Sequence, residues 1–564
     1  MKMNGARIVL ECLKREGVDT IFGYPGGTVI NLYDELFSFK EIRHILPRHE
    51  QAGVHAADGY ARATGKVGVA LATSGPGATN TITGIATAYM DSIPMVILTG
   101  QVPTALIGND AFQEADIIGI TRPCTKHNFL VKDVKELATI MKKAFYIART
   151  GRPGPVLVDL PKDIQMAQCE FHYPETVDIR GYKPTVEGHP KQIEKAVAMI
   201  KEAKKPVIYV GGGVILANAA EELTALAKRL AIPVTTTLMG LGSFPEDDPQ
   251  SLGLLGMHGT YYANMAVSHC DVLIAVGARF DDRVTGKIAS FAPHAKIVHI
   301  DVDPTSIKKN VRVDLPIVGD VREVLAQMLK VTKAHDTKTS KEQLASWIAE
   351  IAGWKEKHPV AYKQTGSTIK PQYVIQRLRA LSDPDAIVAT DVGQHQMWTA
   401  QFFGFTKPRT LLSSGGLGTM GYGLPAAMGA QAAYPERQVI VVCGDGGFQM
   451  NMQELATMVQ NRLNVKIVIL NNNFLGMVRQ WQELFFDKRY SSTCLELPID
   501  FIKLAEAFGA TGLRATKVEE VDEVIKQGFE TKGPVLMEFK VAREEKVLPM
   551  VPAGASLTEM VLAS

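Results

Sequence analysis

Two strand-ending loops in the last third of the chain carry residue types that hold a divalent cation. The apolar run QVIVVC is followed by Gly444, Asp445, Gly446 and Gly447, and the run VKIVIL is followed by Asn471 and Asn472. Because the carboxyl ends of parallel strands meet at one sheet edge, where ligands bind, we expect these loops to be neighbours. A carboxylate and an amide oxygen there could hold an octahedral Mg²⁺ that bridges a diphosphate. Each loop alone would also suit an ordinary turn, but the pair in this strand context favours a ligand site.

A second candidate lies in LPRHEQAGVHAADGYARATGK, residues 46–66. Its spacing predicts a helix from about Arg48, with two small or apolar faces that suit a closely packed, mostly buried element. Glu50 opens the apolar stripe. A carboxylate in that place is either a structural cap of the helix or a group that meets a ligand. The sequence therefore raises the question of what Glu50 touches.

The elements that would position these residues repeat three times along the chain. Short β-branched runs alternate with helical patterns, which is typical of α/β layers with mainly parallel sheets. Two polar stretches, residues 169–192 and 334–371, separate the three sets. The sequence thus predicts an α/β protein with three domains, at 1–170, 190–335 and 368–550.

Composition narrows the class of protein. With 564 residues, 46% of them hydrophobic and 21% charged, the chain is long enough for several packed cores. The formal charge of +2 and the lack of a basic run make nucleic acid and anionic membranes improbable partners. No apolar stretch has the roughly 20 residues of a membrane span. Six widely spaced cysteines form no CxxC pair, and the N-terminal pattern predicts an amphipathic helix rather than a signal peptide. We expect a cytoplasmic protein.

Motifs over nearly the whole chain carry a family resemblance. GYPGGTVINLYDEL (23–36), RHEQAGVHAADGYAR, GRPGPVLVDLPKDI (151–164), GARFDDRVTG, SSGGLGTMGYGLPAAMGA, GMVRQWQELFF and VLPMVPAG resemble the catalytic (large) subunits of acetohydroxyacid synthase, also called acetolactate synthase. These enzymes use thiamine diphosphate (ThDP). The resemblance implies ThDP-binding folds in the first and third domains and a Rossmann-like middle domain that binds FAD.

The resemblance assigns residues to the reacting centre. It implies that Glu50 of one subunit forms a hydrogen bond with the pyrimidine N1′ of a ThDP that another subunit holds. This contact favours the imino tautomer of the pyrimidine, which can remove the thiazolium C2 proton. The other residues that it places at the reacting centre are Gly27, Phe112, Gln113 and Lys162. Those that it places on ThDP are Pro25, Val392, Gly393, Gln394, His395, Gly418, Met420, Gly444, Asp445, Gly446, Gly447, Asn472, Leu475, Gly476 and Met477. Met420 resembles the large apolar residue that forces the bent cofactor conformation.

The middle domain contains YVGGGV, which is a poor dinucleotide fingerprint because it is not GxGxxG and lacks a suitably spaced acidic residue. NAD is therefore disfavoured. The resemblance instead implies FAD, bound by Arg152, Gly211, Gly212, Gly213, Thr237, Leu238, Met239, Gly256, Met257, His258, Gly277, Arg279, Asp281, Arg283, Val284, Asp301, Val302, Asp320 and Val321. It also implies that Arg283, Met257 and Trp481 select the second substrate, because a guanidinium suits a carboxylate and an indole can sense alkyl size.

Two positions depart from the family pattern. Thr28 follows the double glycine where alanine is common, and Phe474 stands where an acidic residue is frequent. Only the carbonyl of Phe474 could then serve Mg²⁺, beside Asp445 and Asn472.

The resemblance implies decarboxylation of pyruvate and ligation to a second 2-oxoacid, pyruvate or 2-oxobutyrate, on the route to branched-chain amino acids. It also implies a homodimer or homotetramer with active sites at the subunit interface and a small regulatory subunit. A flavin-linked pyruvate oxidase, another ThDP carboligase or decarboxylase, and an inactive ThDP-fold scaffold are the alternatives. Flavin turnover would favour the oxidase, and a failure to bind ThDP would favour the scaffold.

Overall fold

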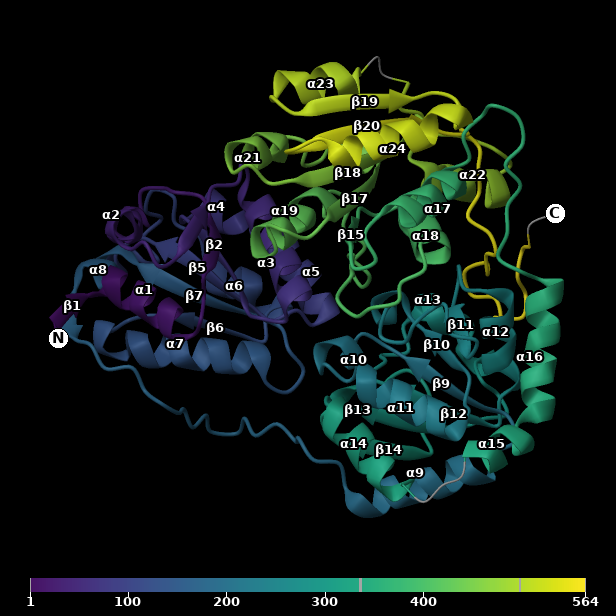
Figure 1. Ribbon diagram of the computed structural model, residues 1–564. Coiled ribbons are helices and arrows are strands. Elements are labelled where there is room, and N and C mark those ends of the chain that lie inside the picture. The colour runs from purple at the N-terminus through teal and green to yellow at the C-terminus, as the bar shows by residue number, and fades with distance from the viewer. Residues whose placement is uncertain (1, 334–336, 497–498, 563–564) are drawn as a thin grey trace.

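The computed structural model describes residues 2–333, 337–496 and 499–562 and contains three α/β domains (Figure 1). Each has a six-stranded sheet in which every neighbouring pair is parallel, flanked by helices. The predicted fold class is confirmed. Each sheet falls within one of the predicted domain ranges, whose exact limits stay a prediction, and the limit at residue 335 lies outside the described residues.

The first domain has strand order β3-β2-β4-β5-β7-β6, with a small antiparallel β1–β8 pair at its edge. Its elements are β1 (Lys2–Asn4), α1 (Gly5–Arg15), β2 (Thr20–Gly23), α2 (Ile30–Ser38), β3 (Arg43–Ile45), α3 (Glu50–Thr64), β4 (Gly68–Ala72), α4 (Pro76–Thr79), α5 (Ile82–Asp91), β5 (Met95–Gln101), α6 (Ile117–Thr121), β6 (His127–Leu130), α7 (Val134–Arg149), β7 (Pro155–Pro161), α8 (Lys162–Met166) and β8 (Gln168–Glu170).

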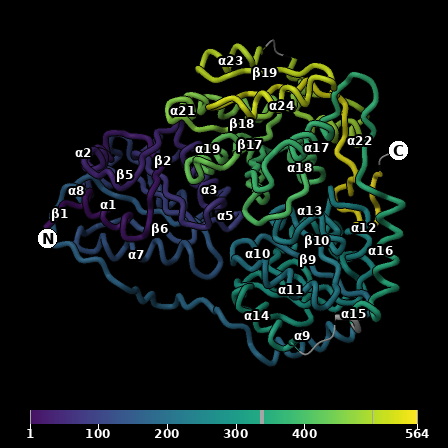
Figure 2. Tube along the Cα trace, viewed as in Figure 1, coloured from purple at the N-terminus to yellow at the C-terminus, as the bar shows by residue number. Residues whose placement is uncertain are grey.

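The middle domain follows a long connection without helix or strand, which runs outside the body of the protein before α9 (Figure 2). Its strand order is β11-β10-β9-β12-β13-β14. Its elements are α9 (Pro190–Glu202), β9 (Pro206–Val210), α10 (Gly213–Leu216), α11 (Ala220–Leu230), β10 (Val234–Thr236), β11 (Ser251–Leu254), α12 (Tyr261–His269), β12 (Val272–Val276), α13 (Asp282–Thr285), β13 (Lys296–Asp301), β14 (Leu315–Val318), α14 (Val321–Val331), α15 (Thr337–Gln343) and α16 (Ala345–Lys357).

The polar stretch at 334–371, which we used as a domain boundary, is not only a linker. Helix α16 lies within it and packs on the middle domain, where Trp347 is buried and its Nε1 donates to the carbonyl of Pro206. The polar residues on both sides of this helix concealed it, although Trp347 and Ile351 are buried against the middle domain.

The third domain has strand order β16-β15-β17-β18-β20-β19. Its elements are α17 (Pro371–Leu381), β15 (Ile387–Thr390), α18 (Gln394–Phe402), β16 (Leu411–Leu412), α19 (Gly423–Ala433), β17 (Val439–Gly444), α20 (Asp445–Phe448), α21 (Glu454–Gln460), β18 (Val465–Asn471), α22 (Gly476–Phe485), α23 (Phe501–Ala507), β19 (Thr511–Ala515), α24 (Val521–Glu530) and β20 (Val535–Lys540). The tail beyond β20 returns to the middle domain, where the amide of Val551 donates to the carbonyl of Met257.

Helix α3 joins the first and third domains. The His49 side chain caps its start, and Gly65, with a φ of 75°, ends it. It lies beside α19, as the ribbon and the backbone trace show (Figures 1 and 2). A Cβ on Gly59 would come within 2.2 Å of the Ala426 carbonyl oxygen, so the two helices approach backbone to backbone. The small faces predicted for α3 therefore form a domain interface, and one buried apolar cluster runs through both domains.

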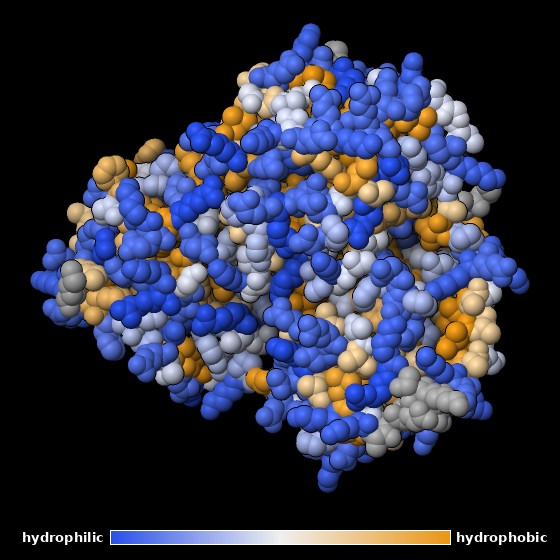
Figure 3. Space-filling model, viewed as in Figure 1, coloured by the Kyte–Doolittle hydropathy of each residue, from blue (hydrophilic) through white to orange (hydrophobic). Residues whose placement is uncertain are grey.

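The surface is ordinary for a globular protein. On the face seen in Figure 3, hydrophilic residues predominate and hydrophobic ones form separate small groups. No helix in the described ranges is long and apolar enough to cross a membrane.

Candidate active site

Asp445 and Asn472 come together as their strands predict. Strands β17 and β18 are parallel neighbours, paired up to Gly444 and Leu470, and the two residues follow directly at the carboxyl edge. Both are buried, and burial raises the pKa of the Asp445 carboxyl to about 6. The Oδ1 atom of Asn472 accepts a 3.0 Å hydrogen bond from the amide of Phe474. An anionic oxygen and amide and carbonyl oxygens thus lie at one edge.

In the part of the chain that the structure describes, no group of three or more His, Cys, Asp or Glu residues is placed to hold a metal ion. The candidate metal position therefore rests on Asp445 with the oxygen atoms of Asn472 and Phe474. Such a set suits a hard cation that also binds ligand oxygens, which is how Mg²⁺ sits on phosphates.

Residues after β15 border this position. Gly393 has a φ of 155°, and the ring of His395 packs against Gly444. Burial lowers the pKa of His395 to about 3, so its imidazole is neutral, and its Nε2 atom has no hydrogen-bond partner among the described residues. The Gln394 amide donates to Gln480 and to the Glu545 carbonyl. An unpartnered buried nitrogen beside a glycine edge fits a site that a ligand completes.

The loop before α19 and the start of α22 complete this edge. A Cβ on Gly446 would lie 2.8 Å from the Leu475 side chain and 3.9 Å from the Cε of Met420, so the three residues are neighbours. Gly447 packs against the Asp391 carboxylate, and Gly476 packs against the Gln394 side chain. All the residues that we expected on ThDP in the third domain therefore cluster at one sheet edge.

The expected residues of the first domain form a second group. Pro25 and Gly27 follow β2, Glu50 follows β3, Gln113 follows β5 and Lys162 follows β7, so all lie at the carboxyl edge of one parallel sheet. Within this group, a Cβ on Gly77 would lie 3.3 Å from Oε1 of Glu50, and one on Gly75 would meet Gln113.

This second group does not line the large cavity of its own chain. Phe112, which we expected to line the pocket, is 88% exposed, and Glu50 and Lys162 lie outside the cavity wall. The reason is that a single chain brings the edge of the third sheet, not that of the first, to the cavity.

The cavity itself has a volume of about 570 Å³ and lies where the three domains meet. Every residue that we expected on FAD lines it except Gly256, which packs instead against the Arg283 carbonyl. Val392, Gly393, Gly418, Met420, Met477 and Trp481 line it as well. The cavity thus runs from the middle domain to the candidate ThDP edge.

The wall of the cavity suits an elongated ligand with phosphates. A Cβ on Gly211 would lie 2.2 Å from the Gly277 carbonyl oxygen, so the β9 and β12 turns meet closely and leave backbone facing the space. Arg152 of the first domain reaches across to Asp303 of the middle domain, and its Nε donates to the Ser92 hydroxyl of its own domain. Tyr209 is fully buried in the wall, and its hydroxyl has no partner among the described residues. These features fit a dinucleotide that supplies the missing partner.

Arg283 and Trp481 meet at the cavity. The guanidinium carbon of Arg283 lies 5.9 Å from the centre of the Trp481 ring, although α13 belongs to the middle domain and α22 to the third. The Arg283 side chain is 58% exposed and forms a long, 3.6 Å ion pair with the exposed Asp282, an arrangement that an anionic ligand can replace. The pair therefore offers a charge and an apolar face side by side.

The sequence analysis did not predict some residues of the cavity wall, above all Asp91, Gln396, Ser414 and Gly415. The one signal for Asp91 was a carboxylate at the end of an otherwise apolar helix, ITGIATAYMD. Its contacts are with Arg62, 29 positions away, and with Gly415 and Gly416, more than 300 positions away, so they leave no local pattern.

Comparisons with known proteins agree with this architecture. Family models described as the N-terminal TPP binding domain, central domain and C-terminal TPP binding domain of thiamine pyrophosphate enzymes match residues 3–120, 193–328 and 391–539. The chain is 50% identical to the acetolactate synthase large subunit of Haemophilus influenzae, over 100% of this chain and 98% of that protein. It is 52% identical to the large subunit of Corynebacterium glutamicum, over 99% and 90%. It is 49% identical to the isozyme 3 large subunit of Escherichia coli, over 100% and 99%.

Proposed function

The chain belongs to the thiamine pyrophosphate enzymes and, among them, to the acetolactate synthase large subunits, and we propose that it catalyses the decarboxylating condensation of pyruvate with a second 2-oxoacid. Pyruvate as acceptor gives 2-acetolactate, and 2-oxobutyrate gives 2-aceto-2-hydroxybutyrate. Both products lead to branched-chain amino acids. The observation that carries the proposal is that Gly393, Met420 and Met477, which belong to the same sheet edge as Asp445 and Asn472, line the cavity that holds Arg283 and Trp481.

Asp445, Asn472 and the Phe474 carbonyl would hold Mg²⁺ on the cofactor diphosphate. The neutral His395 imidazole, whose Nε2 atom has no partner among the described residues, and the Gly393 backbone would border the same phosphates. Gly418 and Met420 would support the ring system from the cavity side. Bound ThDP supplies a carbon centre that stabilises negative charge on the substrate carbonyl carbon.

Glu50 would act on the cofactor of a second chain. Its carboxylate lies outside the cavity of its own chain, whereas the family resemblance implies a contact with the cofactor pyrimidine. Exposed side chains lie in segments that follow strands of the same sheet, Tyr24, Phe112 and Met166 at 37%, 88% and 61%, and they suit a surface that another subunit covers. We therefore propose a homodimer or homotetramer with active sites at the subunit interface, in which Gly27, Gln113, Phe112 and Lys162 come from the same subunit as Glu50.

FAD would occupy the middle-domain arm of the cavity. The glycine turns at Gly211–Gly213 and Gly277 would take its phosphates, and Tyr209 and Arg152 would supply polar contacts. The net condensation needs no electron transfer, so the flavin has no redox role in the proposed reaction.

Arg283 would bind the carboxylate of the second 2-oxoacid, and Trp481 and Met257 would contact its alkyl group. A guanidinium offers a planar pair of donors that matches a carboxylate. The apolar indole beside it can distinguish a methyl from an ethyl group by contact.

The proposed function also includes a partner subunit and a cellular compartment. The relatives are named large subunits, so we propose a separate small regulatory subunit as a partner. All six cysteines are free, which suits a reducing compartment such as the cytoplasm.

A direct assay tests the proposed function. Purified protein with ThDP, Mg²⁺, FAD and pyruvate should form 2-acetolactate, and added 2-oxobutyrate should give the mixed product. Acetyl phosphate or oxygen-dependent flavin turnover would instead identify a pyruvate oxidase, and acetaldehyde a simple decarboxylase. A protein that binds no ThDP would be a scaffold.

A further inference from the structure

Helix α5 ends with Asp91, a carboxylate that does not stabilise the helix itself. Asp91 is the last residue of α5, and anions are unfavourable at that end of a helix. Its side chain is fully buried and pairs with Arg62 of α3, with 2.9 Å between Oδ2 and Nη2. Burying this pair costs desolvation energy, so the carboxylate must have another task that keeps it there.

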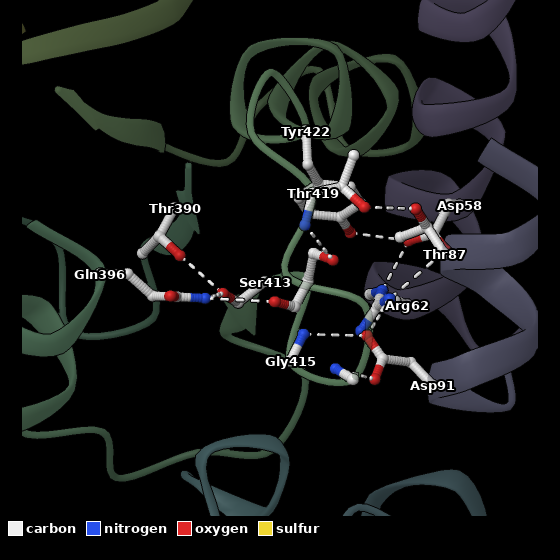
Figure 4. A network of polar contacts seen from close by, with 12 residues as sticks. Asp58, Arg62, Thr87, Asp91, Thr390, Gln396, Ser413, Gly415, Thr419 and Tyr422 are labelled. Atoms are coloured by element: carbon white, nitrogen blue, oxygen red, sulfur yellow. Dashed lines mark hydrogen bonds and ion pairs between the residues drawn. The ribbon is translucent and has the colours of Figure 1, made fainter. Parts of the chain in front are cut away.

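The task is visible in its other contacts (Figure 4). Oδ2 of Asp91 accepts a 3.0 Å hydrogen bond from the amide of Gly415, and Oδ1 accepts one of 2.8 Å from the amide of Gly416. A carboxylate of the first domain thus holds two successive amides of the third domain. These begin the loop that carries Gly418 and Met420, and Asp91 shares the cavity wall with them.

One turn earlier on α5, Thr87 holds the same loop again. Its Oγ1 atom lies 2.7 Å from Oγ1 of Thr419, the residue between Gly418 and Met420, and both side chains are buried. The amide of Thr419 also donates to the Ser414 hydroxyl, which closes the loop on itself. The loop is therefore attached to α5 at both of its ends.

Arg62 holds the Asp91 carboxylate in place by pairing with it. It lies between Asp91 and Asp58, with its Nε 2.5 Å from Oδ1 of Asp58, and Asp58 accepts from the hydroxyl of buried Tyr422. Tyr422 comes directly after the loop at the start of α19. Helices α3, α5 and α19 are thus tied together through one guanidinium, as the labelled side chains in Figure 4 show.

We propose that Arg62 and Asp91 are positioning residues that fix the Gly415–Met420 loop of the same chain in the conformation in which Met420 supports the cofactor. This positioning role rests on the proposed function, in which Met420 contacts ThDP. Neither residue touches the reacting atoms. They act through the loop, so their loss should disturb cofactor activation more than cofactor or substrate binding.

Asp91→Asn tests the proposal, because it keeps the shape but removes the charge and one acceptor. Asp271→Asn is the matched control, since Asp271 likewise accepts from two successive amides, those of Lys204 and Lys205, but lies outside the cavity. Hydrogen exchange measured by mass spectrometry on the cofactor-free protein reports the loop at 413–421. Proton exchange at C2 of bound ThDP, ThDP affinity, kcat and KM for pyruvate report the site.

We expect Asp91→Asn to speed amide exchange in the loop and to lower C2 exchange and kcat by about 10- to 100-fold, since small misplacements near the chemistry cost that much. ThDP affinity and KM should stay within about threefold, because the interaction lost acts in activation rather than binding. Asp271→Asn should match the wild type in all of these. An Asp91→Asn protein with wild-type loop exchange, or with faster loop exchange but wild-type C2 exchange, would overturn the positioning role.

Thr419→Val keeps the test decisive if Asp91→Asn does not fold. It removes the Thr87 contact without burying an unpaired charge, and it should lower C2 exchange in the same direction by a smaller factor. Unchanged C2 exchange in that variant would count against the proposal. A wild-type protein that forms no acetolactate would overturn the proposed function, whereas an active wild type with an unaffected Asp91→Asn overturns only the positioning role.

Discussion

The side-chain amide of Asn80 donates a 3.0 Å hydrogen bond to Oε2 of Glu50. Asn80 directly follows the short helix α4, and the other carboxylate oxygen, Oε1, faces Gly77 of that helix, where a Cβ would lie 3.3 Å away. One oxygen of Glu50 is thus held within its own domain, while the glycine leaves room beside the other. This geometry presents a single oriented oxygen at the carboxyl edge of the first sheet.

We predict that Glu50→Gln slows proton exchange at C2 of bound ThDP by about 10²- to 10⁴-fold, the usual contribution of a positioned proton-transfer group. Glutamine keeps the Asn80 contact through its carbonyl oxygen but cannot share a proton in the same way. NMR of acid-quenched samples measures the exchange, and ThDP affinity should change little. Glu41→Gln is the control, because Glu41 pairs with Lys14 at the surface. Wild-type exchange rates in Glu50→Gln would remove Glu50 from this role.

The parts of the site that the sequence predicted are those whose residues lie on successive strands or in a family motif. Asp445 and Asn472 could be placed together because strand order and parallel pairing bring successive strand ends to one edge. The glycines of the middle domain were found through the family motif, and the structure places nearly all of them on one cavity.

Other features could not be predicted because they depend on distant partners. The polar stripe of α3, including Asp58 and Arg62, would suit a solvated face by its pattern, yet both side chains are buried in the network with Asp91 and Tyr422. Gly415 and Asp91 are 324 positions apart, and only the docking of two domains joins them. Phe112 presents the opposite case, because an aromatic expected in a pocket is exposed on a single chain.

Glu454 gives a prediction about pH. Its buried carboxylate accepts from the amide of Arg48, two residues before Glu50, at 2.9 Å, and burial raises its pKa from 4.5 to about 7. A raised carboxyl pKa means that the folded protein holds the proton more tightly than the unfolded chain. The stability gained is therefore full below about pH 4.5 and is lost as the pH rises through about 7.

We expect the free energy of unfolding of the wild type, relative to Glu454→Gln, to increase by about 2–3 kcal/mol between pH 8 and pH 5. Glutamine cannot titrate, so the variant lacks this contribution. Urea unfolding at several pH values measures the difference. Glu520→Gln is the control, because Glu520 also accepts backbone amides but is partly exposed and has a lowered pKa. A difference that is constant over this pH range would show that Glu454 does not titrate there.

Arg283 and Trp481 should affect the acceptor in different ways. Trp481→Leu removes apolar contact, so it should lower the preference for 2-oxobutyrate over pyruvate by about 10-fold, the value of roughly one methylene contact. Arg283→Lys loses the planar donor pair and should weaken use of both acceptors by a similar factor. Competition between the two 2-oxoacids with product analysis measures both effects. Arg377→Lys, which changes a pair with Asp522 outside the cavity, should leave the product ratio unchanged. Equal ratios in Trp481→Leu and wild type would exclude Trp481 from acceptor selection.

Tyr209 should contribute to flavin binding. Its buried hydroxyl lies in the cavity wall without a partner among the described residues, so a bound flavin would satisfy it. We expect Tyr209→Phe to weaken FAD binding by about 3- to 10-fold, the value of one hydrogen bond, without loss of folding. Flavin fluorescence during titration of the cofactor-free protein measures the affinity. Tyr362→Phe, which loses a contact with Gln376 outside the cavity wall, should bind FAD as the wild type does. Equal affinities in all three proteins would place the flavin elsewhere.

The assignment of Glu50 to a second chain can be tested by mixing two inactive variants. Glu50→Gln alone and Asp445→Asn alone should each lack acetolactate formation, because each damages every site of a symmetric assembly. In a hybrid dimer, one site combines the intact Asp445 edge of the Glu50→Gln chain with the intact Glu50 of the Asp445→Asn chain, and the other site carries both changes. Random exchange of equal amounts should then restore about a quarter of the wild-type activity, since half of the dimers are hybrids and half of their sites are intact in a two-fold assembly. As a control, the dimers are cross-linked before mixing so that subunits cannot exchange, and this mixture should recover no activity. If exchange is shown by mass and activity does not return, Glu50 and Asp445 serve the same chain's cofactor and the interface site is wrong.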